Sequence, residues 1–304
     1  MSDAPRSAVR SVEADVRRIG SRMVPAVRDR RDVDGCACLA CRNLEPAVRR
    51  RSILETLLWS VQLVRTYPSV VLFALAFVSL RRLLELDVLP IAAPVVGLLE
   101  ATATVVLFFL VRAYVAVIVT TELSNVRMPV RNRVRHSLER LPALVGVIVA
   151  TVAVLVFVWM LSVVPTMALF AGLAVAPVDP AAGWPIPIAG VLAMAVTSLA
   201  TLFVIFKLWL AMEACIVGGY GPLASLRISW RITGNYRGKL LAVVLAVAAS
   251  VGLLYVAGSV PVFDDASSPL GVAVGWTFAT LADLTSVVWF GVYAHLYVQG
   301  IVDG

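Results

Sequence analysis

The stretch from residue 142 to residue 166, PALVGVIVATVAVLVFVWMLSVVPT, decides the fold class of this chain. It runs for 25 residues without a charged side chain, and about 20 apolar residues suffice for a helix to cross a bilayer. The 304 residues together are 60% hydrophobic and 15% charged, with a mean hydropathy of +0.91. We therefore predict an all-α integral membrane protein. The composition excludes a purely soluble globule, a disordered chain and a secreted disulfide scaffold.

Five further segments have a similar composition, which gives six predicted membrane spans. The spans cover residues 68–86, 90–119, 142–166, 187–211, 239–260 and 270–299. Residues 52–66 mix apolar with charged side chains, so we expect an interfacial helix there that ends before Pro68. Residues 1–51 form an arginine-rich N-terminal arm, and residues 52–304 form the six-span membrane domain. We expect no signal peptide, because no apolar run precedes residue 53.

Most basic residues fall in segments on one side of the predicted membrane spans. If the N-terminus is inside, 23 of the 26 Lys and Arg residues fall in inner segments, and Arg81 and Arg82 fall in an outer connection, whereas Arg112 lies within a span. Cytoplasmic connections carry such an excess of Lys and Arg. We therefore expect a multi-pass protein of a prokaryotic plasma membrane, with both termini in the cytoplasm.

The two larger inner connections each predict a basic amphipathic helix. The apolar stripe of the first is Val130, Val134, Leu138 and Leu141, and that of the second is Leu223, Leu226, Trp230 and Thr233. Pro222 stands at the first helical position of the second helix and Gly234 just past its end. The candidate face for anionic lipid or a partner protein consists of Arg131, Arg133, Arg135, Arg227 and Arg231. The simpler alternative is that both helices merely lie at the membrane interface.

The second connection also contains a short motif. It reads Gly221-Pro222, Leu226-Arg227, Ser229-Trp230 and Thr233-Gly234-Asn235. This motif resembles the loop of a six-span membrane domain that is fused to some glycerophosphoryl diester phosphodiesterases and also occurs alone in archaeal and bacterial proteins of unassigned function. The resemblance covers about residues 52–300 and implies a fold and a membrane location. The phosphodiesterase chemistry of the fused proteins lies in a separate soluble barrel, for which this chain has no room, so no catalytic residue is implied.

The four cysteines are the candidate metal ligands. Cys36, Cys38 and Cys41 lie close together in the arm, and Cys215 falls at the inner end of the fourth span. Four thiolates would suit a structural zinc ion, although the usual pair of CxxC motifs is absent. Reversible acylation, redox sensing and inert thiols are the alternatives. We expect no other cofactor.

Three charged residues lie well inside predicted spans, away from their ends, where an ionised side chain is costly and faces protein or water. Asp283, near the middle of the sixth span, is the candidate proton or cation site. Its alternative is a structural carboxyl bonded to Thr280, Ser286 or another helix. Glu100 and Arg112 share the second span but lie about 18 Å apart along it, too far to pair. We expect Arg112 to extend to the cytoplasmic interface.

Motifs of catalysis are absent from the sequence. No Walker loop, GxGxxG, GxSxG or HExxH occurs, and Gly218-Gly219-Tyr220-Gly221 follows a span rather than a strand, which argues against a phosphate site. We therefore expect a non-enzymatic membrane protein that organises lipid or a partner protein at its basic cytoplasmic face. The alternatives are a small transporter or permease subunit that uses Asp283 and, ranked last, a lipid-acting membrane enzyme. Nucleic acid is not an expected partner.

Overall fold

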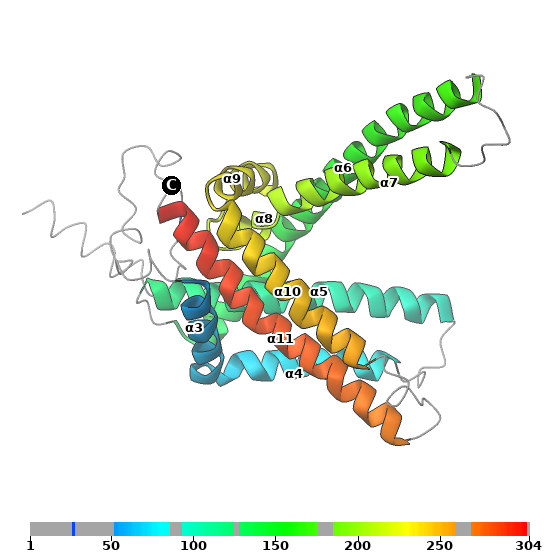
Figure 1. The fold of residues 1–304 in the computed structure, drawn as a ribbon. Helices are drawn as coiled ribbons and strands as arrows, with labels where there is room; N and C mark the ends of the chain where they lie inside the picture. Colours follow the sequence, from blue (N-terminus) through cyan, green and yellow to red (C-terminus); the bar gives the residue numbers. More distant parts are fainter. Residues whose placement is uncertain are drawn as a thin grey trace, which may run out of the picture.

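The computed structural model describes residues 26–27, 52–85, 93–124, 128–175, 185–258 and 269–302. Nine helices and no strand occur in this part of the chain (Figure 1), which confirms the all-α prediction. The helices are α3 (Ile53–Thr66), α4 (Pro68–Glu85), α5 (Ala93–Leu123), α6 (Val130–Val175), α7 (Pro185–Lys207), α8 (Ala211–Ile216), α9 (Pro222–Asn235), α10 (Arg237–Gly258) and α11 (Pro269–Val302).

Among the described residues, five helices are long and apolar enough to cross a membrane, and α3 with α4 would make a sixth as one bent pair. The two helices of this pair meet at 84°. Tyr67 leaves the helical conformation between them, and Pro68, which has no N–H to give to a preceding turn, begins α4. Ser52 and Glu55 start α3 with a capping box. The predicted helix end before Pro68 is confirmed.

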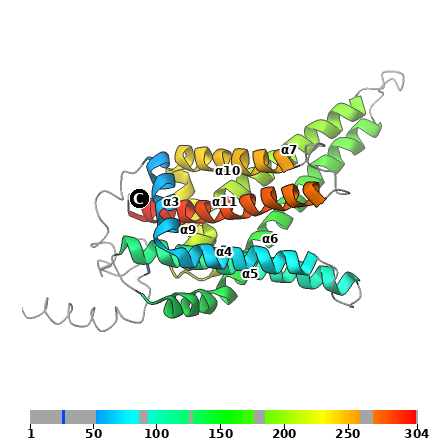
Figure 2. The ribbon, with the colours of Figure 1, turned by 90° about the horizontal axis from the view of Figure 1, so that it is seen from below.

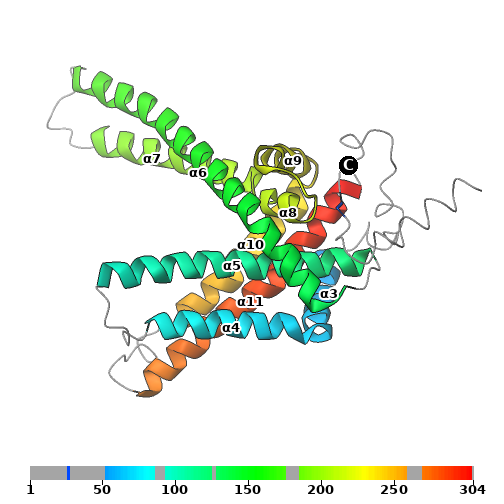
Figure 3. The ribbon, with the colours of Figure 1, turned by 180° about the vertical axis from the view of Figure 1, so that it is seen from behind.

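The helices meet at one end of the molecule and separate toward the other (Figures 1 and 2). We call the meeting end the base; it consists of α3, α8, α9 and the last turns of α11, which contact one another. From the base, α4, α5, α10 and α11 extend as one group, whereas α6 and α7 leave it as a separate pair (Figure 3). Most fully buried side chains belong to α8, α9 and the adjoining halves of α5 and α11. The core therefore lies toward the base.

The first predicted amphipathic helix is not a separate element. Residues 130–141 and the third predicted span form one helix, α6, of 46 residues, with Pro142 in its interior. The side of α6 that faces the core carries the buried residues Arg133 and Ser137, whereas Val130 and Leu138 are about half exposed. The predicted apolar stripe is therefore divided, because Val134 and Leu141 pack against the core whereas Val130 and Leu138 face outward.

The second amphipathic helix, α9, starts with Pro222 as predicted, and the four residues of its predicted stripe are divided between two faces. Leu223 is 76% exposed and Trp230 is 45% exposed. The buried face consists of Ser225, Leu226, Ile228, Ser229, Ile232 and Thr233. Gly234 lies inside the helix rather than past its end. The inward face is rich in hydroxyl groups because it bonds to a break in the neighbouring span.

Candidate functional site

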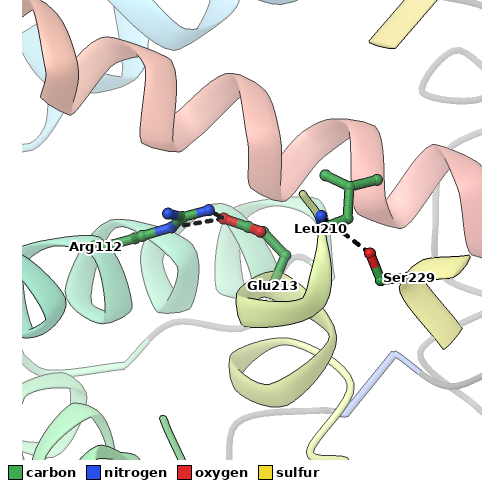
Figure 4. A network of polar contacts seen from close by, with 4 residues as sticks. All are labelled: Arg112, Leu210, Glu213 and Ser229. Carbon is green, nitrogen blue, oxygen red and sulfur yellow. Dashed lines mark hydrogen bonds and ion pairs between the residues drawn. The ribbon is translucent and has the colours of Figure 1, made fainter. Parts of the chain in front are cut away.

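The fourth predicted span is interrupted near the base. α7 ends at Lys207, and a turn through residues 208–210 precedes α8. Such a break frees main-chain groups that need new partners. The Ser229 hydroxyl of α9 donates to the Lys207 carbonyl at 2.9 Å and accepts from the Leu210 N–H at 3.1 Å (Figure 4). The Thr233 hydroxyl lies 3.2 Å from the same Lys207 carbonyl. α9 thus supplies the hydrogen bonds that the interrupted helix lacks.

The interruption brings Glu213 of α8 against Arg112 of α5. Arg112 Nε and Nη2 donate to Glu213 Oε1 at 2.8 and 2.5 Å (Figure 4). The side chains are 9% and 0% exposed, respectively. The guanidinium carbon also lies 5.6 Å from the ring centre of Phe290 and 5.5 Å from that of Tyr293. The expectation that Arg112 reaches the interface is therefore wrong, because the residue forms a buried ion pair.

The pair of Glu213 and Arg112 was not predicted from the sequence. The two residues are 101 positions apart, and their contact depends on the turn after α7. One signal was available, since a Glu and an Arg stood at a similar depth near the inner ends of two predicted spans. A buried charge of each sign at one depth favours pairing.

Asp283 lies on α11 and lines a cavity of about 30 Å³. Phe108 and Val111 of α5 and Ser286, Val287 and Phe290 of α11 complete the lining. A volume of this size holds about one water molecule. The hydroxyls of Thr280 and Ser286 donate to carbonyl groups of their own helix. Glu100 belongs to α5, and its side chain is outside the described part of the structure.

The five arginines predicted as a binding face are divided by the fold. Arg131, Arg135 and Arg227 are exposed, and Arg231 is partly exposed. Arg133 is buried instead, with its guanidinium carbon 4.8 Å from the ring centre of Tyr67, so its assignment to the face is corrected. α6 and α9 pack closely, since a Cβ at Gly146 would lie 2.6 Å from the Pro222 ring. The exposed arginines of both helices therefore belong to the same region of the molecule.

Aromatic rings accompany the cations beside α9. Lys207 Nζ lies 5.4 Å from the ring centre of Trp230 and 5.8 Å from that of Phe203. Lys239 Nζ lies 5.7 Å from the ring centre of Tyr236. Trp, Tyr and basic residues gather in this way where membrane helices enter the headgroup region.

The cysteines are only partly described. Cys215 is a free thiol on α8 with no exposed surface. Cys36, Cys38 and Cys41 lie outside the described residues. Within those residues, no group of three or more metal-ligating side chains occurs. A zinc site that joins the arm to Cys215 stays a prediction.

A wider groove, of about 790 Å³, lies between α6 and α7. Its lining includes Trp159, Met167, Met194 and Leu202, together with several hydroxyl residues and no charged side chain. This groove is separate from the ion pair and from the cavity at Asp283, and its apolar lining matches lipid chains.

Comparisons with known proteins supply no relative. No family model, no curated protein and no solved structure matches this chain. The resemblance to the membrane domain of glycerophosphoryl diester phosphodiesterases accordingly stays a prediction from the motif around Trp230. What the protein does must be inferred from its own residues.

Proposed function

We propose that this protein is a non-enzymatic, multi-pass membrane protein that binds anionic lipid headgroups at its base. The observation that carries the proposal is the outward face of α9. Exposed Leu223 and Trp230 share this face with Arg227 and Arg231, at helical spacings of four, seven and eight residues from Leu223. A helix that presents apolar and basic side chains together suits the boundary between acyl chains and headgroups.

The distribution of charge supports a cytoplasmic orientation for the base. Ten of the chain's Lys and Arg residues lie in or next to four segments: the N-terminal part of α6, the end of α7, α9 and the start of α10. The excess of basic residues assigns all four segments to the cytoplasmic side. The inner leaflet of a cell membrane carries the anionic lipids. The Lys207–Trp230 contact places a cation and an amphipathic ring beside the same face. We infer six spans with both termini in the cytoplasm of a prokaryotic cell.

The binding of phosphatidylglycerol to the purified full chain tests this function. Each Lys or Arg near an anionic surface contributes about 1 kcal/mol, so Arg227→Gln should lower the affinity about fivefold. Arg227→Lys is the matched control, because it changes the same side chain but keeps its charge on the α9 face. Native mass spectrometry of the protein with phosphatidylglycerol or phosphatidylcholine gives the two affinities.

The control should change the phosphatidylglycerol affinity by less than about twofold, since the charge at the surface is kept. Equal affinities for wild type and Arg227→Gln would contradict a lipid-binding α9 face. Loss of a co-purifying protein from Arg227→Gln, with lipid binding intact, would instead indicate a partner protein at this face.

A second function, a small transporter or permease subunit, is supported by the cavity at Asp283. The cavity lies between α5 and α11, both candidate spans, and ionisable side chains that face cavities within spans mark proton and ion pathways. Proton flux into proteoliposomes tests it. Asp283→Asn should lower the flux at least about tenfold, whereas Glu139→Gln, a change of an exposed carboxylate on α6, should not. Equal flux in Asp283→Asn and wild type, or no flux in either, would rule out this function.

A further inference from the structure

Two residues of the N-terminal arm, Ala26 and Val27, are part of the base. Val27 is fully buried. Its N–H donates to the Val217 carbonyl at 3.0 Å, and its carbonyl accepts from the Tyr297 hydroxyl at 3.1 Å. Val27 and Tyr297 are 270 positions apart. The arm is therefore held through both main-chain groups of one residue and through the burial of its side chain.

The loop after α8 is shaped to receive this segment. A Cβ at Gly218 would clash with the Tyr297 hydroxyl and would lie 2.5 Å from the Tyr220 ring. Gly219 has φ 64°, in the left-handed region that favours glycine. The two glycines let the loop pass close to α11, so the Tyr297 hydroxyl can reach the main chain of the arm. The sequence Gly218-Gly219-Tyr220-Gly221 follows a span rather than a strand, which argues against a phosphate site. Its first two glycines instead allow the close packing of this loop.

We propose that this slot is a docking site for the chain's own arm, and that docking makes the arm's arginines part of the lipid-binding surface at the base. Residues 16–25, directly before the docked pair, include Arg17, Arg18 and Arg22 and no acidic residue. Five residues of chain keep Arg22 within about 17 Å of Val27. The contribution to lipid binding rests on the proposed function, whereas the docking itself does not.

The recognition is chemically simple. Two main-chain hydrogen bonds hold any extended segment in one register, and a closed slot around the Val27 side chain favours a small apolar residue at that position. Val27 precedes Arg28 and Asp29, so a shift of register toward these residues would bury a charge, and Pro25 has no N–H for the Val217 carbonyl. The occupant of the slot is therefore the arm, held at Val27.

Limited digestion of the full chain with trypsin tests the docking. Cleavage after Arg28 requires the docked segment to open, since Val27 is the adjacent residue, whereas cleavage after Arg10 does not. Val27→Asp should raise the rate of cleavage after Arg28, relative to that after Arg10, by at least about tenfold. Tyr297→Phe removes one neutral hydrogen bond and should raise the ratio about fivefold.

Val33→Asp is the matched control, because it introduces the same charge elsewhere in the arm and is next to neither Arg10 nor Arg28, and it should leave the ratio unchanged. A melting temperature close to that of wild type shows, for each variant, that the membrane domain is folded. If Val27→Asp unfolds the domain, Val27→Ala and Tyr297→Phe give the same test. A ratio in Val27→Asp and Tyr297→Phe equal to that of wild type would overturn the docking site.

Phosphatidylglycerol affinity tests the second half of the proposal. Val27→Asp should lower the affinity about fivefold, the contribution of roughly one arginine at the surface, and substitution of Arg17, Arg18 and Arg22 by glutamine should lower it at least as much. Faster cleavage after Arg28 with unchanged affinity would overturn the role of the arm in lipid binding. Failure of the lipid-binding function itself would appear separately, in the Arg227→Gln comparison.

Discussion

Replacing Glu213 by glutamine leaves the buried Arg112 guanidinium without its carboxylate while keeping the volume of the side chain. Both Arg112 nitrogens donate to one Glu213 oxygen, and the two side chains are 9% and 0% exposed. Loss of one partner from a buried pair costs about 3–5 kcal/mol, because the remaining charge stays desolvated. We expect Glu213→Gln and Arg112→Met each to destabilise the base by about 3 kcal/mol.

Cys215 provides the assay. It is two residues from Glu213, on the same short helix, and has no exposed surface, so its thiol reacts only when α8 opens. Serine replacements of Cys36, Cys38 and Cys41 leave Cys215 as the single thiol of the chain. A cost of 3 kcal/mol corresponds to labelling about 100-fold faster in mild detergent.

The double variant Arg112→Met/Glu213→Gln decides whether charge is the cause. It contains no unpaired charge, so its labelling rate should return to within about tenfold of the wild-type rate. Glu139→Gln, which breaks the exposed pair with Arg135, should change the rate by less than about twofold. Single variants that label within about threefold of wild type, or a double variant whose effect is the product of the two single effects, would refute the reasoning.

Three further changes test the rest of the base by thermal unfolding. Ser229→Ala should cost about 1–3 kcal/mol, because it leaves the buried Leu210 N–H of the α7–α8 break without its partner, whereas Ser162→Ala, which loses only a bond to its own helix, should cost less than about 1 kcal/mol. Gly218→Ala should lower the melting temperature by several degrees, since its Cβ clashes with neighbouring rings, and Gly252→Ala, with open space around it, should not. Arg133→Gln should lower stability but leave phosphatidylglycerol affinity unchanged, because this arginine is buried; a loss of affinity alone would contradict its interior position.

Local chemistry explains what the sequence predicted well. The apolar run around residues 142–166 predicted a long helix, because a segment without charges has one stable form in lipid. Pro68 and Pro222 marked helix starts, because a residue without an N–H fits the first turn of a helix and disrupts a later one. These effects involve neighbouring residues only, so they are readable without knowledge of the fold.

Tertiary contacts explain what the sequence could not predict. The stripe of α9 did not show which side of the helix packs inward, because the interior there contains the hydroxyls of Ser229 and Thr233, whereas Leu223 and Trp230 lie outside. Arg133 likewise lies inside because the Tyr67 ring, supplied by a distant turn, covers it. The docking of Val27 was not predicted, because the short apolar run Met23–Val27 lies in a charged arm and the partners Val217 and Tyr297 are distant in the sequence.

The length of α6 has a mechanical consequence. Its 46 residues make a rod of about 69 Å, more than twice the roughly 30 Å hydrocarbon thickness of a bilayer. Pro222 contacts α6 at Gly146, and about 44 Å of helix lies between Gly146 and Val175. A tilt of α6 by about 10° around Gly146 would move its end at Val175 by roughly 8 Å. The part of α6 from Val130 to Gly146 is about 24 Å long, so a displacement of its first turn is amplified about twofold at the opposite end of the helix.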